Sequence, residues 1–259
     1  MHTYNSLYRQ IADLGLKKDD TLLIHSSLKS VGEIEGGAET LLEALEDYFK
    51  DGLLIFPTHT WSYIQKDGDV FDKVNSDSCV GALTNIARKR QGYYRSNHPT
   101  HSVCAKGNKA YEYVQLDNET STPTKPDGCF GILKDINGYI LFLGAKLSKN
   151  TFVHSIEEAM NVPNRFTDKK FNFITLMEDG TKKEYQTYRH YNKECPHISD
   201  NYEKLLPFFL EKNIAQKHQI GDAECYLVDA KKCFDFVCDI LNQDIDALST
   251  NKDIKNLIR

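Results

Sequence analysis

Residues 21–57, TLLIHSSLKSVGEIEGGAETLLEALEDYFKDGLLIFP, carry the clearest structural pattern in the chain. The two ends of this stretch, residues 21–24 and 53–56, are short apolar runs typical of buried strands. Between them, after a Gly-Gly pair and before an Asp-Gly pair, apolar residues recur on one face of a helix over residues 38–50. A strand–helix–strand unit of this length predicts a parallel pair of strands with a right-handed crossover.

The rest of the chain continues the same alternation of strands and helices. The patterns predict a third buried strand at residues 139–144, helices at about 79–90 and 151–160, a hairpin of residues 171–176 and 184–189 around Glu178-Asp179-Gly180, and a strand at 225–228 followed by a helix. We find no internal repeat, low-complexity tract or linker. The sequence therefore predicts one α/β domain over residues 1–259.

Composition limits the classes of function. Of the 259 residues, 40% are hydrophobic and 27% are charged, which is typical of a soluble globular protein, and the net charge of −5 argues against binding to nucleic acid or to an anionic membrane surface. The N-terminus lacks the features of a signal peptide, and no apolar run approaches the roughly 20 residues of a membrane helix. The seven cysteines form no Cys-x-x-Cys pair, which favours reduced thiols and a cytoplasmic location.

Three polar clusters follow predicted strands, where open α/β sheets bind their ligands. Residues 25–32 place hydroxyl groups and free backbone N–H groups where they could hold a phosphate, although a turn with a serine helix cap explains them equally well. Residues 57–61 read Pro-Thr-His-Thr-Trp, and residues 95–102 contain an arginine, two histidines and three hydroxyl side chains. A polar surface loop is an alternative for residues 95–102.

The segment 151–158 places His154 on one helical face with Glu157 and Glu158. A carboxylate on one ring nitrogen fixes the tautomer of the imidazole and raises the basicity of the other nitrogen, which favours a general base. An exposed ion pair is the simpler explanation of this spacing. The sequence alone leaves both open.

A metal site is a weaker alternative. His190, Cys195 and His197 offer three ligands within eight residues, but they match no standard zinc spacing and have no obvious fourth partner. We therefore expect no metal, and a zinc-dependent hydrolase remains an alternative that metal analysis would separate.

Together, these segments resemble the aminoglycoside 3-N-acetyltransferase family, which differs in fold from the GNAT acetyltransferases. The resemblance covers about residues 5–240, and Ser96–Val103 (Ser-Asn-His-Pro-Thr-His-Ser-Val) is its most specific string. The matching segments, in family order, are residues 25–28 with 36–38, 57–61, 95–103, 135–144, 151–157, 162–165 and 221–230.

The resemblance implies a three-layer α/β/α sandwich with a mixed central sheet and acetyl-CoA as cosubstrate. It implies His154 as the catalytic histidine, with Glu157 orienting its ring. We expect the Thr151 hydroxyl, the Thr58 hydroxyl or a backbone N–H to stabilise the oxyanion, and we expect no covalent intermediate on a cysteine. The residues expected to bind the coenzyme are His25, Ser26, Ser27, Leu28, Ser30, Val31, Gly32, Thr58, Ser96, His98 and Ser102.

The acceptor implied by the resemblance is an amine of an aminoglycoside or a related amino sugar. Residues 188–197, however, are basic and aromatic, with Glu194 as the only carboxylate, where the resistance enzymes of the family carry acidic residues. This departure favours an anionic acceptor, such as a nucleotide-linked amino sugar used for surface polysaccharide. A homologue that binds CoA without turnover is a further alternative, and a homodimer is a possible assembly.

Overall fold

A seven-stranded mixed sheet organises the computed structural model, which describes residues 1–258. The strand order is β4-β5-β2-β1-β6-β10-β9. Its members are β1 (Thr21–Ser26), β2 (Leu53–Pro57), β4 (Tyr94–Arg95), β5 (Val103–Gly107), β6 (Tyr139–Leu143), β9 (Ala215–Ile220) and β10 (Ala223–Asp229). The predicted parallel pair is confirmed, because β1 runs parallel to β2 and also to β6. Antiparallel strands extend the sheet at both edges.

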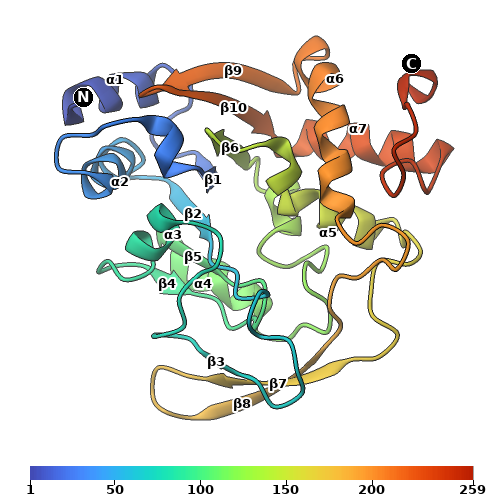
Figure 1. Ribbon diagram of the computed structural model, residues 1–259. Coiled ribbons are helices and arrows are strands. Elements are labelled where there is room, and N and C mark those ends of the chain that lie inside the picture. Colours follow the sequence, from blue (N-terminus) through green and yellow to red (C-terminus); the bar gives the residue numbers. More distant parts are fainter. Residues whose placement is uncertain (259) are drawn as a thin grey trace.

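Helices cover both faces of this sheet, which confirms the predicted three-layer arrangement (Figure 1). On β2, Leu54 and Phe56 pack with the helices of one face, whereas Leu53 and Ile55 pack with those of the other. The first face carries α1 (Tyr4–Ala12), α2 (Ala38–Tyr48) and α3 (Ala82–Ala87), and the second carries α4 (Ala110–Val114), α5 (Thr151–Ala159), α6 (Leu206–Glu211) and α7 (Ala230–Gln243). No helix within residues 1–258 is long and apolar enough to span a membrane.

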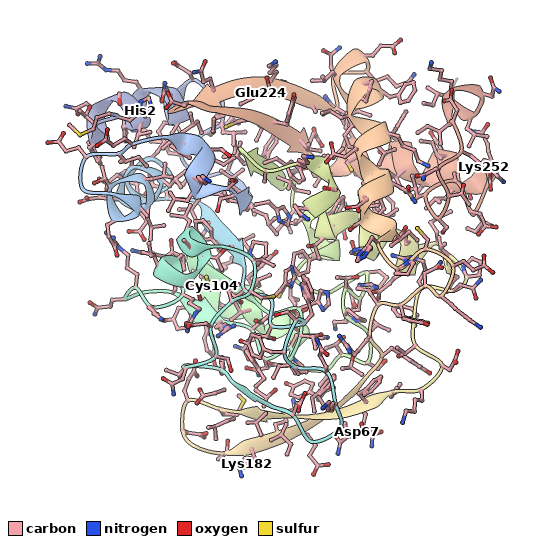
Figure 2. The ribbon with its side chains drawn as sticks, viewed as in Figure 1. His2, Asp67, Cys104, Lys182, Glu224 and Lys252 are labelled. Atoms are coloured by element: carbon pink, nitrogen blue, oxygen red, sulfur yellow. The ribbon has the colours of Figure 1, made fainter. Side chains whose placement is uncertain are left out.

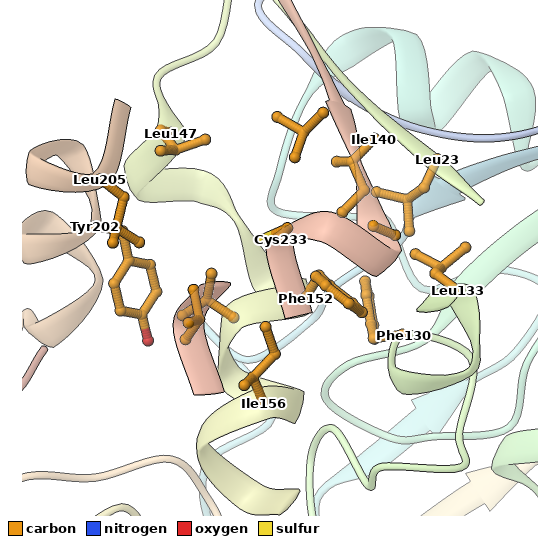
Figure 3. Packing of buried hydrophobic residues seen from close by; sticks show 14 of the residues in the cluster. Leu23, Phe130, Leu133, Ile140, Leu147, Phe152, Ile156, Tyr202, Leu205 and Cys233 are labelled. Atoms are coloured by element: carbon orange, nitrogen blue, oxygen red, sulfur yellow. The ribbon is translucent and has the colours of Figure 1, made fainter. Parts of the chain in front are cut away.

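Helix α5 is held by its apolar side. Figure 3 shows Phe152 and Ile156 of this helix close to Cys233 of α7, with Leu23 and Ile140 of the sheet nearby, and all five belong to one buried cluster. Full burial of an aromatic or branched side chain contributes about 1.5–3 kcal/mol. This packing fixes the rotation of α5 and so determines which of its polar residues face away from the core.

A smaller sheet lies at the opposite end of the molecule from both termini (Figure 1). It contains β3 (Val70–Asp72), β7 (Phe171–Leu176) and β8 (Lys182–Thr187), in the order β3-β7-β8. The predicted hairpin is confirmed by the antiparallel pairing of β7 with β8. Its second strand begins two residues earlier than predicted, because a turn closed by Met177 N–H donating to the Thr181 carbonyl places Lys182 opposite Leu176.

Other boundaries also differ from the predictions. The helix expected at residues 79–90 is only Ala82–Ala87, because Gly81 has a φ of 140°, outside the helical region, and the chain turns after Arg88. The sequence patterns do not predict helices α1, α4 and α6 or strands β3, β4, β5 and β9. The 3₁₀ helices are η1 (Leu28–Val31), η2 (Gln115–Asp117), η3 (Gly131–Lys134), η4 (Leu147–Lys149), η5 (Ile198–Leu205) and η6 (Lys255–Leu257).

Candidate active site

The carboxyl ends of β1, β2 and β6 meet at one edge of the sheet, beside a cavity of about 820 Å³. Figure 2, viewed as Figure 1, shows side chains around this edge of the sheet near the centre of the molecule. Several parts of the chain line the cavity. The ends of the strands contribute His25, Ser26, Ser27, Pro57, His59, Trp61 and Gly144, and the start of α5 contributes Asn150, Thr151 and His154. The chain after β8 contributes Arg189 and His190, and the start of η5 contributes His197, Ser199 and Asp200.

His154 directs one ring nitrogen into a buried polar cluster. Its Nδ1 lies 3.1 Å from Glu157 Oε2, 2.7 Å from Tyr202 Oη and 2.8 Å from Arg165 Nη2. Within residues 1–258, no hydrogen bond to His154 Nε2 is found. Because the side chain also lines the cavity, the geometry leaves Nε2 available to a bound molecule.

Glu157 is the centre of that polar cluster. Its Oε2 accepts from Arg165 Nε at 2.8 Å, from Arg165 Nη2 at 2.5 Å and from Tyr202 Oη at 2.8 Å. Burial tends to raise the pKa of Glu157, but the Arg165 guanidinium and the surrounding donors outweigh it, so the pKa is lowered and the carboxylate is ionised. Burial also raises the pKa of Tyr202 well above its ordinary value, so this side chain remains a phenol.

The pKa of His154 is lowered. Burial is the largest cause, and it outweighs the hydrogen bond and the charge of Glu157, which act in the opposite direction. From the sequence, the carboxylate alone predicts a more basic imidazole, whereas the fold adds burial, which acts in the opposite direction. In the fold the ring is neutral at pH 7, which is the form that can accept a proton.

Glu158, the second predicted partner of His154, points elsewhere. Its Oε1 accepts from the backbone N–H and the hydroxyl of Thr124, and burial raises the pKa of its carboxyl group to about 7. Its nearest histidine is His190, with 3.8 Å between Oε1 and Nε2. The His190 ring lies against that of His154, with 4.4 Å between the ring centroids and a 30° interplanar angle.

The residues expected to bind the coenzyme fall into two groups. His25, Ser26 and Ser27 line the cavity, whereas Leu28, Ser30, Val31 and Gly32, in and after η1, do not. Ser30 supports the loop, because its hydroxyl lies 2.9 Å from Ser27 Oγ. The His25 ring stacks on Phe142 with 5.2 Å between the centroids, and burial lowers its pKa to about 3.

Thr58, Ser96, His98 and Ser102 lie outside the cavity lining, in a buried hydrogen-bonded network. Thr58 Oγ1 is 2.8 Å from Ser102 Oγ and accepts from Arg95 Nε, and Ser96 Oγ accepts from the backbone N–H of Val103. These contacts hold the ends of β2 and β5 together. That these four side chains contact the coenzyme stays a prediction, and the structure shows their polar atoms in hydrogen bonds within the fold.

Two further side chains on the α5 wall face the cavity. Thr151 Oγ1 lies 3.2 Å from His59 Nε2. Asn150, at the N-cap of α5, is 1% exposed, and within the described chain neither its Nδ2 nor its Oδ1 has a hydrogen-bond partner. Asn150 and Tyr202 were not predicted, since neither belongs to a recognisable local pattern, and Arg165 entered only through the family resemblance.

The candidate zinc ligands do not come together. His190 and His197 line the cavity, but Cys195 does not, and its Sγ accepts from Asn201 Nδ2 at 3.6 Å. Among residues 1–258, no group of three His, Cys, Asp or Glu side chains is arranged to hold a metal ion. The described structure therefore does not bring the three candidate zinc ligands to one point.

Comparison with known proteins agrees with this geometry. Residues 23–242 match the family model described as aminoglycoside 3-N-acetyltransferase. Among individual relatives, the chain is 27% identical over 266 residues to aminoglycoside N(3)-acetyltransferase VII of Streptomyces paromomycinus, covering 90% of this chain and 89% of that protein. It is structurally similar to AAC-IIIb in a binary complex with CoASH, with a TM-score of 0.80, 23% identity, and coverage of 93% of this chain and 97% of that one. It is also similar to sisomicin-bound AAC-VIa, with a TM-score of 0.77, 22% identity, and coverage of 93% and 98%.

Proposed function

The chain belongs to the aminoglycoside 3-N-acetyltransferase family, and from that premise we propose that it transfers an acetyl group from acetyl-CoA to an amine of a small molecule, with His154 as the general base. The observation that carries this proposal is the unpartnered Nε2 of His154 at the cavity, with its Nδ1 anchored in a buried polar cluster. We propose that His25, Ser26 and Ser27, at the end of β1, contact the coenzyme.

The proposed reaction is a direct transfer. The acceptor ammonium first loses one proton to solvent, and the neutral amine then attacks the thioester carbonyl. As the N–C bond forms, the carbonyl π electrons move to oxygen, and His154 Nε2 accepts a second proton from the nitrogen. When the oxyanion collapses, the C–S bond breaks and the thiolate takes that proton from the imidazolium. The products are the amide, the CoA thiol and one released proton.

The tautomer of His154 decides whether this step is feasible. We propose that Nδ1 carries the proton and donates towards Tyr202 and Glu157, which leaves Nε2 as an acceptor. The ionised Glu157 favours this tautomer electrostatically. The Tyr202 phenol can accept from Nδ1 while donating to Glu157. Arg165 Nη2 lies 2.8 Å from Nδ1 and can only donate, so this tautomer requires its N–H, like that of Nε, to point to Glu157 Oε2.

The charges of the cavity favour one class of acceptor. Among the described residues that line it, Asp200 is the only carboxylate, against Lys146, Lys149 and Arg189. The two lysines follow β6, beside Ser26 and Ser27, where coenzyme phosphates would meet them. Arg189 lies apart from them: its guanidinium donates to the carbonyls of Trp61 and Gln65 and forms no ion pair with a carboxylate of residues 1–258.

We therefore propose, as a second candidate within the same chemistry, that the amine acceptor carries a carboxylate or a phosphate and binds it at Arg189. A guanidinium offers N–H pairs that match both anions. The exposed indole of Trp61, whose carbonyl accepts from Arg189, provides an adjacent apolar surface for a sugar or a base. A polycationic aminoglycoside would meet like charge at this wall.

The function is tested by the release of CoA thiol and the mass of the acetylated product. The panel is kanamycin, gentamicin, glucosamine, glucosamine 6-phosphate, muramic acid and a nucleotide-linked amino sugar. We expect amine-dependent thiol release and a mass gain of one acetyl group. If acetyl-CoA binds but no amine in the panel is acetylated, the non-turnover homologue replaces the proposed enzyme.

The acceptor class is tested separately with Arg189→Gln and the matched control Lys193→Gln, which removes the same charge from an exposed position outside the cavity lining. We expect wild type to prefer glucosamine 6-phosphate over glucosamine, and this preference to fall about tenfold in Arg189→Gln but not in the control. Higher salt should weaken it. Efficient turnover of the aminoglycosides, with no preference for anionic amines, would contradict an anionic acceptor while supporting the acetyltransferase.

A further inference from the structure

Asn150 is a buried amide in the cavity wall with nothing to bind. Only 1% of the residue is exposed, and both Nδ2 and Oδ1 lack a hydrogen-bond partner among residues 1–258. Its backbone is satisfied, because its N–H donates to the Leu147 carbonyl and its own carbonyl accepts from Val153. The unsatisfied groups therefore belong to a side chain of the cavity lining whose Nδ2 and Oδ1 are both covered, so a bound carbonyl oxygen reaches Nδ2 only after a small shift of the wall.

The position in the helix makes this arrangement costly. Asparagine at an N-cap ordinarily accepts from a backbone N–H of the first helical turn, but Asn150 makes no such bond to α5. A buried amide without partners destabilises a fold, so evolution seldom leaves one without a reason. Binding of a transient group of a substrate would explain both the missing cap hydrogen bond and the buried amide without partners.

The hydroxyls expected to stabilise the oxyanion are less available. The Thr58 hydroxyl lies outside the cavity lining and is engaged by Ser102 and Arg95. The Thr151 hydroxyl faces the cavity but lies within hydrogen-bond distance of His59 Nε2. Asn150 directly precedes α5, His154 lies in the first turn of that helix, and both residues line the cavity.

Resting on the proposed function, we infer that Asn150 is a catalytic residue whose Nδ2 donates a hydrogen bond to the carbonyl oxygen of the acetyl thioester. As the amine adds to the carbonyl carbon, the π electrons become a full charge on that oxygen, and the hydrogen bond strengthens. The proton removed from the amine goes to His154 Nε2. Asn150 and His154 thus act on opposite charges of one tetrahedral intermediate, the oxyanion and the amine proton.

The test is steady-state kinetics and thermal unfolding of wild type, Asn150→Ala and Asn150→Asp, with the best amine of the panel. We expect both variants to lower kcat by roughly 10²–10³, with the KM for acetyl-CoA changed less than about threefold. The aspartate keeps the shape but offers no donor when ionised. In Asn150→Ala, loss of the unsatisfied amide should leave the unfolding midpoint unchanged or raise it.

Asn97→Ala is the matched control, because Asn97 is also buried but lies outside the cavity lining, and its Nδ2 donates to Asn118 although its Oδ1 has no partner among the described residues. This variant should show the reverse pattern, with a lower unfolding midpoint and a kcat near that of wild type. If wild type is active and Asn150→Ala keeps a near-normal kcat, the role of Asn150 is overturned but the proposed function stands. The same holds if the substitution changes only the KM for acetyl-CoA. A wild type that acetylates no amine would overturn the proposed function as well.

Discussion

His154 and His98 are both buried histidines in segments that resemble one enzyme family, yet the fold uses their rings differently. His98 Nδ1 accepts from the backbone N–H groups of Thr100 and His101, at 3.1 and 3.0 Å, and Nε2 lies 3.1 Å from the Thr122 carbonyl. Both of its nitrogens are therefore bound to backbone. His154 has partners only on Nδ1 within the described chain, and its ring lines the cavity.

We infer from this comparison that the availability of a ring nitrogen at the cavity, more than burial, distinguishes the proposed base His154 from His98, whose ring binds the backbone. Burial lowers the pKa of both rings, that of His98 to about 4. Both are neutral at pH 7, so both could accept a proton by that criterion alone. Only His154 presents a nitrogen to the cavity, and the account predicts that only its removal abolishes chemistry.

The largest expected effect is that of His154→Ala on the rate. Loss of a positioned proton acceptor should lower kcat by roughly 10²–10⁴, while acetyl-CoA should still raise the unfolding midpoint by mass action. The wild-type rate should rise with pH as the imidazole loses its proton, with a midpoint below the ordinary value of about 6.5 because burial lowers the pKa of His154. The rate of His154→Ala should not show this rise with pH.

His98→Ala should affect stability instead. It leaves the backbone N–H groups of Thr100 and His101 without their partner, each at a cost of about 1–3 kcal/mol. The Thr122 carbonyl keeps the hydrogen bond from the Thr120 hydroxyl. We expect a lower free energy of unfolding by denaturant and a kcat of the folded protein within about threefold of wild type. A stable but inactive His98→Ala, beside an active His154→Ala, would move the base to the loop of His98 and His101.

The same comparison predicts an acid limit on stability. The pKa of His98 is lower in the folded protein than in the unfolded chain. The contribution of the neutral His98 ring to the free energy of unfolding is therefore fully present above about pH 6.5. It is lost as the pH falls towards 4, at up to about 1.4 kcal/mol per pH unit. In His98→Ala, the slope of unfolding free energy against pH between 6.5 and 4 should therefore be shallower than in wild type. An unchanged slope would show that His98 is protonated in the native state.

Smaller effects are expected from the cluster that holds His154. Tyr202→Phe removes one hydrogen bond to Nδ1 and one to Glu157, and should lower kcat about tenfold, the equivalent of roughly 1.4 kcal/mol. Glu157→Gln should also cost less rate than His154→Ala, but it leaves the buried Arg165 without its counter-charge and should lower stability by about 3–5 kcal/mol. A Tyr202→Phe enzyme with the wild-type rate and pH profile would limit Tyr202 to packing.

Local patterns predicted much of this molecule. The β1–α2–β2 unit is contiguous, and the contact of His154 with Glu157 spans one helical turn, so both could be predicted from spacing. Tyr202 lies 45 residues beyond Glu157, and its approach depends on how η5 packs against α5, which no local pattern encodes. Figure 3 shows Tyr202 beside Leu205, within the apolar cluster that brings its hydroxyl to the site.

The polar string Ser96–Val103 shows what a local sequence pattern does not predict. Its residues could be identified as characteristic of the family, but the side chains of Ser96, His98 and Ser102 bind neighbouring strands and loops, and within this string only His101 lines the cavity. Whether a polar side chain faces a cavity or the interior depends on the turns between strands. Asn150 was missed for the same reason, since an asparagine before a helix ordinarily indicates a cap.

The central claim is that His154 holds its proton on Nδ1 and keeps Nε2 free for the acceptor amine. The most direct measurement is the ¹⁵N NMR spectrum of the ring nitrogens in histidine-labelled protein near pH 7.5, assigned with His154→Gln and His98→Gln. We predict opposite tautomers: His154 with a proton on Nδ1 and a bare Nε2, and His98 with a proton on Nε2 and a bare Nδ1. A His154 ring protonated on Nε2 would contradict the account, because it would offer the amine a donor in place of a base.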